Sequence, residues 1–417
     1  MISIASAGLS QPARPMMGAE FDFYLSEMSI SVGHGGGLTL QRIIGPELGG
    51  INLFALLGRF ATDFPTEERH LPRYLELPGR FESDYARAII GCTAASWLHH
   101  RATARRMHAR RAARAVSARF PSITQPLLGL ICPQGIASLY TLEALSRLRS
   151  IEYVTWIMDD QLIRWEGRGW RYPSGAEEML SRHLRGAKCV FAISPAMAEL
   201  YQKRFGVRSR VLFGPAIDYG EPVCDRPSQD ACVSLGYFGA LLDWQCGALK
   251  ALARQLKLAN ARLDIYTAHR SAPTDLQVPG VTFKGRVPPS EVPSLMRCYD
   301  AVVLPASFEP RCRHLSELNI ATKMSECLAS GTLTLLIAPP YAAMVRFLES
   351  TGAAVIVQEE TERAVVSAVE RIRDQAERRP IIRAARDLVR DKLSAAAMRR
   401  TWMEGVACLA TSSVSCR

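Results

Sequence analysis

The residues with the clearest capacity for chemistry lie in one stretch, AVVLPASFEPRCRHLSELNIATKMSECLASGTLTLLIAPP, at residues 301–340. Its first apolar run is followed by Glu309, and a helix predicted to begin at Thr322 carries Lys323 and Glu326. Residues three apart share one helix face, so these two charges lie together. An ammonium group beside a helix N-terminus can bind a diphosphate, and a carboxylate can accept hydrogen bonds from both hydroxyls of a ribose. The alternative is a surface ion pair without a ligand.

Two further carboxylates, Asp159 and Asp160, follow the apolar run YVTWIM. Ligands of α/β proteins bind at the carboxyl ends of the strands, where a carboxylate can orient a nucleophile or accept a hydrogen bond from a sugar hydroxyl. Trp156 lies in the run itself, and its ring could stack on a sugar. In the alternative, the two aspartates cap the next turn and Trp156 belongs to the core.

A glycine loop at residues 33 and 35–37 follows a predicted strand at residues 28–32 and precedes a predicted helix. Glycines at this point let the backbone approach a ligand, and the helix N-terminus offers free N–H groups to an anion. The dinucleotide fingerprint GxGxxG is incomplete, because Leu38 stands where its third glycine would be. A dehydrogenase is therefore disfavoured, and a tight turn without a ligand is the alternative.

From residue 231 the chain alternates apolar runs of strand length with runs of helix length, and the first half shows the same alternation less regularly. Apolar strands separated by helices indicate a parallel sheet covered on both faces. The predicted fold class is α/β, with two Rossmann-like, doubly wound domains that face a central cleft. We place an N-terminal extension at 1–27, the first domain at 28–219, a linker at 220–230, the second domain at 231–395 and a C-terminal helix and tail at 396–417.

The 417-residue chain is basic, with 51 Lys+Arg against 40 Asp+Glu, and its strongest basic feature is the stretch Arg101–Arg119. This alanine-rich segment is predicted to be helical. Its arginines spread around much of the helix, which does not favour insertion into a membrane interface. Three alternatives stay open: a solvated helix, an anionic membrane surface or lipid phosphate, and nucleic acid, for which the sequence has no recognisable binding signature.

Composition excludes several other classes of protein. The first residues lack the charged and apolar regions of a secretory signal, and the longest apolar stretch, from Thr332, is too short to span a membrane. The 11 cysteines form no CxxC pair and no zinc-ligand spacing, so neither a disulfide framework nor a metal site is expected. These features predict a cytoplasmic protein.

The chain resembles the retaining GT-B glycosyltransferases of the group 1 class, and it is similar to glycosyltransferase family 4. The resemblance covers about residues 28–395 and is carried by HGGGLTL, HLRGAKCVFAISPAMAELYQKRFG, GYFGALLDW, FKGRVPPSEVPSLMRCYDAVVLP and TKMSECLASGTLTLL. It implies that a nucleotide-sugar donor gives its sugar to a glycan or polyprenyl-linked acceptor, with retention at the anomeric carbon, in polysaccharide synthesis. It also implies that no metal or cofactor is required and that the protein works on the inner face of the membrane when the acceptor is lipid-linked.

The same resemblance implies catalytic roles for Asp159 and Glu309, and it places Asp160 and Trp156 on the acceptor side. The donor-binding residues that it implies are Gly36 and Gly37 at the diphosphate, Gly285, Arg286 and Val287 at the nucleobase, Glu326 at the ribose, and Gly239, Thr322 and Lys323 beside them.

Two departures from the family pattern bear on activity. Sixteen residues separate Glu309 from Glu326, where seven are usual; Glu317 has the usual spacing from Glu309 but lacks the small-residue helix and glycine that should follow. After Leu242 the chain reads DWQCGALK, where the family commonly has an Arg and a Lys on the diphosphate. A non-catalytic nucleotide-sugar or glycan-binding module, an epimerase and an inverting transferase therefore stay open as alternatives.

Overall fold

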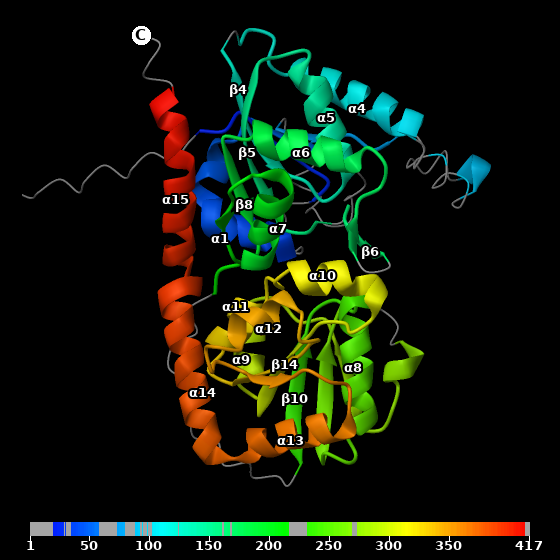
Figure 1. The fold of residues 1–417 in the computed structure, drawn as a ribbon, viewed down its shortest axis with the longest axis vertical. Helices are drawn as coiled ribbons and strands as arrows, with labels where there is room; N and C mark the ends of the chain where they lie inside the picture. Colours follow the sequence, from blue (N-terminus) through cyan, green and yellow to red (C-terminus); the bar gives the residue numbers. More distant parts are fainter. Residues whose placement is uncertain are drawn as a thin grey trace, which may run out of the picture.

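The structure is a computed structural model that describes residues 20–28, 30, 35–57, 73–79, 88–91, 94, 98, 102–123, 125–160, 162–166, 169–216, 232–268 and 273–412. In this part of the chain two α/β lobes lie one above the other in Figure 1, and each is built around its own parallel sheet. The predicted linker at 220–230 lies outside the described residues, as do residues 1–19 and 413–417.

The first lobe contains a seven-stranded sheet with the order β3-β2-β1-β4-β5-β8-β9. Its strands are β1 (Phe23–Ser26), β2 (Leu53–Leu56), β3 (Tyr74–Glu76), β4 (Leu127–Cys132), β5 (Ile151–Ile157), β8 (Cys189–Ala192) and β9 (Arg210–Val211). Its helices are α1 (Gly35–Gly50), α4 (Ala102–Ser117), α5 (Ile136–Ser146), α6 (Ala176–Gly186) and α7 (Pro195–Phe205), and a hairpin of β6 (Arg164–Glu166) and β7 (Gly169–Arg171) projects from it.

The second lobe contains a six-stranded sheet with the order β12-β11-β10-β13-β14-β15. Its strands are β10 (Val233–Phe238), β11 (Ala261–Tyr266), β12 (Val281–Gly285), β13 (Ala301–Pro305), β14 (Leu333–Ile337) and β15 (Val355–Val357). Its helices are α8 (Asp243–Gln255), α9 (Val292–Met296), α10 (Arg313–Leu318), α11 (Met324–Ala329), α12 (Ala343–Leu348), α13 (Glu362–Arg373) and α14 (Gln375–Leu388), with short 3-10 turns η3 (Thr274–Leu276) and η4 (Pro310–Cys312). A π-helical turn, η5 (Val389–Leu393), leads into α15 (Ala395–Ser412).

The predicted fold class is confirmed, because both sheets are parallel and their central strands are largely buried. β10, β13 and β14, for example, have no exposed residue. A local signal explains where α7 begins, since the Ser194 side chain accepts a hydrogen bond from the Met197 N–H. Pro46 lies inside α1, and the backbone is non-helical at Ile44, as expected for a proline kink.

The first strand does not lie where the sequence predicted it. β1 is formed by Phe23–Ser26 rather than by residues 28–32, of which the described residues Met28 and Ile30 are not in a strand. It pairs with both β2 and β4, at the centre of the sheet. Residues 23–26 therefore belong to the first lobe and not to an N-terminal extension. The prediction failed because MSISV has the apolar alternation of a strand, while FYLS is short.

The chain returns to the first lobe at its end. In Figure 1, α14 rises along one side of the second lobe and α15 continues beside the first, where it packs against α1 and β8. Trp402 is fully buried there; its ring stacks on Phe191 at 5.0 Å, and its Nε1 donates a hydrogen bond to Glu47. The helix predicted after residue 395 is thus present, and it ties the two lobes together.

A short segment of the second lobe, Leu318–Glu326, lies directly against the first lobe, and we call it the interdomain segment. Gly214 closely approaches the Thr322 backbone, because a Cβ built on this glycine would lie 3.0 Å from Thr322 Cα. Three hydrogen bonds hold the segment: from Ser194 Oγ to Leu318 O, from Asn319 Nδ2 to Asp159 Oδ1 (2.8 Å) and from Ser325 Oγ to Gly214 O (2.5 Å).

The buried ring of Trp402 makes a test of this arrangement. We expect Trp402→Ala to lower the free energy of unfolding of the first lobe by about 3–5 kcal/mol, because it removes a large buried side chain and leaves a cavity. Thermal and urea unfolding measure this, with Arg400→Ala, an exposed position of the same helix, as the control. A loss below 1 kcal/mol in Trp402→Ala would contradict the docking of α15.

Candidate functional site

Two cavities open where the carboxyl ends of the two sheets meet. We name them by one acidic residue each. The Glu326 pocket, of about 290 Å³, lies between α1, the ends of β10 and β11, and the segment that follows β12. The Asp159 pocket, of about 310 Å³, lies between the ends of β5 and β6 in the first lobe and α8 and α10 in the second. Both are therefore shared by the two lobes.

The Glu326 pocket brings together residues that the sequence predicted separately. Gly239, Arg286, Val287 and Glu326 all line it, although they come from two different loops and a helix. It also contains residues that the sequence analysis did not identify. These include Leu38 and Arg42 from α1, Phe238, Ala240, Tyr266, Thr267, Ala268, Pro289, Val292 and Met296. Apolar side chains thus form much of the wall, and a few charged groups converge inside, which is typical of a small-molecule site.

Glu326 is paired across the lobes. Its Oε1 lies 2.5 Å from Nη1 of Arg42, and the two side chains are only 17% and 18% exposed. Arg42 stands two turns into α1, after the glycine loop, and nothing in its local sequence marks it. Only the approach of α1 to α11 brings the two charges together.

Lys323 points at the β10–α8 loop beside the Glu326 pocket. Its Nζ donates a hydrogen bond of 2.9 Å to the Tyr237 hydroxyl and lies 4.0 Å from the centre of that ring. Burial lowers the pKa of the Lys323 ammonium to about 8, and within the described residues it forms no ion pair with a carboxylate. A buried cation that lacks a carboxylate partner is suited to a bound anion.

Gly239 has a backbone conformation that favours glycine, and it lies against Lys323. Its φ is +149°, a conformation that favours glycine, and a Cβ at this position would lie 2.9 Å from Lys323 Nζ. Gly285 also has a positive φ, of +75°, but open space surrounds it. Thr322 lies in the interdomain segment near the glycine loop, with its Oγ1 3.2 Å from where a Gly35 Cβ would be.

The glycine loop itself has a packing role. A Cβ on Gly36 would come within 2.2 Å of Met28 Sδ, so this glycine permits the close packing of α1 against the core. Gly37 is buried at the start of α1. Neither lines the two cavities, and their predicted contact with a diphosphate stays a prediction. Gly33 lies outside the described residues.

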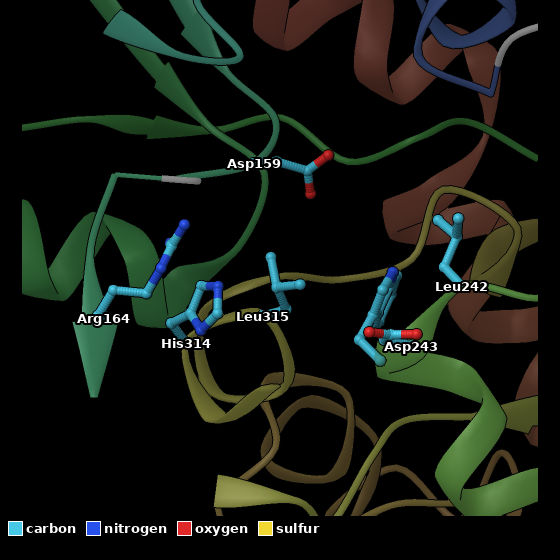
Figure 2. Close-up of a pocket in the computed structure, with 7 residues that line it drawn as sticks. Asp159, Arg164, Leu242, Asp243, His314 and Leu315 are labelled. Atoms are coloured by element: carbon cyan, nitrogen blue, oxygen red, sulfur yellow. The ribbon is translucent and has the colours of Figure 1, made fainter. Parts of the chain in front are cut away.

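In the Asp159 pocket the carboxylate of Asp159 points from the end of β5 toward side chains of the second lobe (Figure 2). Arg164 and His314 lie on one side of this space, and Asp243 lies on the other. Leu242, Trp244 and Leu315 complete the lining. Carboxylates, an imidazole, a guanidinium and an indole in one small cavity can bind the hydroxyls and the apolar face of a sugar ring.

Burial and the neighbouring Asp160 raise the pKa of Asp159 to about 6. One Asp159 oxygen accepts the hydrogen bond from Asn319, so the second lobe fixes the direction of the carboxylate. His314 is also buried, which lowers its pKa to about 4, and its Nδ1 has no hydrogen-bond partner among the described residues. At neutral pH this imidazole is uncharged and can accept or donate a hydrogen bond inside the pocket.

Glu309 lines neither cavity. Its carboxylate pairs with Arg311 at 2.5 Å, is 43% exposed, and faces Gly247 of α8. The residues that separate it from Glu326 form η4, α10 and the interdomain segment. Its predicted catalytic role stays a prediction.

Asp160 and Trp156 are structural residues, which corrects the expected acceptor contact. Trp156 is fully buried in the core of the first lobe. Asp160 is 4% exposed, and its oxygens accept hydrogen bonds from the Leu162 and Ile163 N–H groups and from the Tyr172 and Tyr201 hydroxyls. The aspartate thus fixes the loop after β5, as the alternative interpretation of the sequence proposed.

Within the part of the chain that the structure describes, no group of His, Cys, Asp or Glu side chains is arranged to hold a metal ion. No helix of that part is both long enough and apolar enough to cross a bilayer.

No protein-family profile matches the chain, and no sequence of a characterised protein does either. Solved structures do match. Sucrose-phosphate synthase from Thermosynechococcus elongatus superposes with a TM-score of 0.65 at 15% identity, over 94% of this chain and 99% of that one. Anabaena HepE in complex with UDP and glucose gives 0.60 at 14% identity, over 94% and 99% of the two chains. WaaG, a glycosyltransferase involved in lipopolysaccharide biosynthesis, gives 0.57 at 12%, over 92% and 99%. The chain therefore has the GT-B fold that the sequence predicted.

The raised pKa of Asp159 predicts a pH-dependent stability. The folded protein holds this proton more tightly than the unfolded chain, so stability falls as the pH rises from about 4 through 6. We expect Asp159→Asn to remove much of this fall and to be more stable than the parent at pH 7, by on the order of 1–3 kcal/mol. The asparagine keeps an oxygen for the bond from Asn319. Unfolding curves at several pH values test this, and identical pH profiles for the two proteins would refute it.

Proposed function

We propose that this protein is a glycosyltransferase that takes a sugar from a nucleotide-sugar donor and transfers it to a glycan or lipid-linked acceptor in the cleft. The observation that carries the proposal is the Glu326 pocket. It combines the carboxylate of Glu326 with the guanidinium groups of Arg42 and Arg286, and the ammonium of Lys323 lies beside it. The HepE structure, which has the same fold, was solved with UDP and glucose.

The two cavities divide the donor between them in this proposal. The nucleoside occupies the Glu326 pocket, the diphosphate lies by Gly239 and Lys323, and the sugar enters the Asp159 pocket. The bond from the anomeric carbon to the diphosphate oxygen breaks, and the acceptor oxygen forms the new bond on the same face of the sugar. The acceptor proton leaves with the diphosphate, whose developing charge the nearby cations stabilise. Asp159 and His314 orient the sugar hydroxyls.

A donor screen tests the proposal. Binding and hydrolysis of UDP-, GDP-, ADP-, CMP- and dTDP-sugars are measured by calorimetry and by release of the nucleoside diphosphate. We expect one donor to bind and Glu326→Ala to weaken its binding by roughly 1–3 kcal/mol, through loss of charged hydrogen bonds. Activity without added metal and in EDTA, together with the anomeric configuration of the product by NMR, tests the metal-independent, retaining reaction that the family resemblance implies.

The chain offers a closely matched control, Glu317→Ala. Glu317 also forms an ion pair with an arginine, at 2.6 Å, and is 16% exposed, close to the 17% of Glu326. It also has the seven-residue spacing from Glu309. Equal losses of donor binding in the two variants would reject the ribose role of Glu326, and no binding of any donor would reject the proposed function.

One observation favours a second candidate, a non-catalytic binding module of the same fold. The family's basic pair after β10 is replaced, and the acidic Asp243 lines the Asp159 pocket at that point. A module of this kind binds a nucleotide sugar or a glycan without turnover. Donor binding without release of nucleoside diphosphate, even with a range of acceptors, would favour it over the enzyme.

We also propose that α4 brings the protein to an anionic membrane surface, where a lipid-linked acceptor would lie. The helix buries Ala109, Ala112, Ala113 and Val116 against the first lobe. Its exposed side carries Arg106, Arg110, Arg111 and Arg114. The sequence predicted arginines around much of the helix, and the structure shows that the small residues form a separate face for packing. Arg101 lies outside the described residues.

Vesicle sedimentation tests this interaction. Replacing these four arginines by Gln should reduce binding to vesicles with 30% anionic lipid by roughly 1 kcal/mol per residue at low salt. The control carries the same substitution at four exposed arginines elsewhere, Arg254, Arg363, Arg383 and Arg400. Equal binding by both quadruple variants would contradict a specific role for α4, and binding to generic RNA or DNA that falls steeply with salt would favour nucleic acid instead.

A further inference from the structure

Arg42 has no role in the resemblance from which the other site residues were predicted. It lies on α1 of the first lobe and reaches across the cleft to Glu326, the residue expected to hold the donor ribose. The 2.5 Å ion pair therefore occupies Oε1 of the Glu326 carboxylate, an oxygen that a carboxylate holding both ribose hydroxyls would need. Either Arg42 moves when a nucleotide binds, or Glu326 does not hold the ribose.

Moving Arg42 away from Glu326 is costly unless it finds another anion. Both side chains are mostly buried, and a buried charge that loses its partner is strongly disfavoured. Among the described residues that line the pocket, Glu326 is the sole acid, so no other carboxylate there can receive the guanidinium.

The charges in and beside the pocket identify the new partner. Arg42, Arg286 and Lys323 carry three positive charges when protonated, and Glu326 carries one negative charge. A diphosphate ester supplies the two negative charges that balance them. Guanidinium groups also match phosphate oxygens in a bidentate geometry.

We propose that Arg42 is an exchange residue. It pairs with Glu326 while the pocket is empty, and it moves to the diphosphate when the ribose hydroxyls take its place on Glu326. Arg42 and Glu326 thus each keep a polar partner in both states, and one arginine of the first lobe replaces part of the basic pair that the second lobe lacks after Leu242. This inference rests on the proposed function, because it requires a nucleotide in the Glu326 pocket.

The experiment compares two ligands, the nucleoside diphosphate of the donor and the nucleoside alone, by calorimetry. We expect Arg42→Gln to weaken nucleoside diphosphate binding by about tenfold or more. The same variant should bind the nucleoside several-fold more tightly, because the competitor for Glu326 is gone. Glu326→Gln should weaken the binding of both ligands. Arg42→Lys, which keeps the charge, should retain most of the preference for the diphosphate.

The control is Arg204→Gln, whose arginine forms a similar 2.5 Å ion pair with Glu177 inside the first lobe and should leave both affinities unchanged. If Arg42→Gln lowers the affinity for both ligands to the same extent, the exchange is overturned, since this result indicates a merely structural residue. An equal gain in affinity for both ligands would overturn it too, since it indicates that Arg42 competes for Glu326 but does not contact the diphosphate. If the parent protein binds no nucleoside diphosphate, the proposed function itself fails, and this outcome is distinct from the other two.

Discussion

The site depends on how the interdomain segment, Leu318–Glu326, is held against the first lobe. Its polar anchors are backbone carbonyls and buried side chains, among them Ser194, Asn319 and Ser325. Such groups are costly to bury without partners, so each lobe satisfies hydrogen bonds of the other. Because the segment runs directly into α11, this docking fixes Lys323 and Glu326 relative to α1 and β5. The positions of the two cavities follow from this contact, because residues of both lobes line each of them.

The same segment explains the departure from the family spacing between Glu309 and Glu326. The extra residues are not a loose loop, because they form η4, α10 and the anchor at Asn319. Arg313 on α10 lies over the Trp165 ring of the β6–β7 hairpin, at 3.6 Å from its centre, which adds a cation–π contact between the lobes. These residues thus contribute contacts between the lobes. They also bring His314 into the Asp159 pocket, where the chain gains a buried imidazole.

The sequence predicted the parallel sheets well, and it predicted residues that the structure brings together in one cavity, since both follow from local patterns. The role of these residues in donor binding stays a prediction. Apolar runs define strands, and the carboxyl ends of parallel strands meet at one edge, which places Gly239, Arg286 and Glu326 together. Contacts between the lobes could not be predicted in this way. Arg42 and His314 are joined to the site only by the packing of one lobe on the other, which leaves no periodic signal. The predicted acceptor contacts of Trp156 and Asp160 failed for a related reason. An aromatic residue or a carboxylate at a strand end is equally typical of a protein core.

The basic pair that the family resemblance leads one to expect after Leu242 is absent, but cations of other elements lie around the same loop. Lys323 is held by the Tyr237 hydroxyl and by the face of its ring rather than by a carboxylate, and burial lowers its pKa toward neutrality. A bound diphosphate would raise that pKa again, so anion binding and protonation of Lys323 favour each other. Within the described residues the second lobe thus keeps a cation without an ion pair close to Gly239, and the first lobe keeps Arg42 neutralised by Glu326. This arrangement limits the repulsion among cations in the empty pocket and leaves them available for a doubly charged ligand.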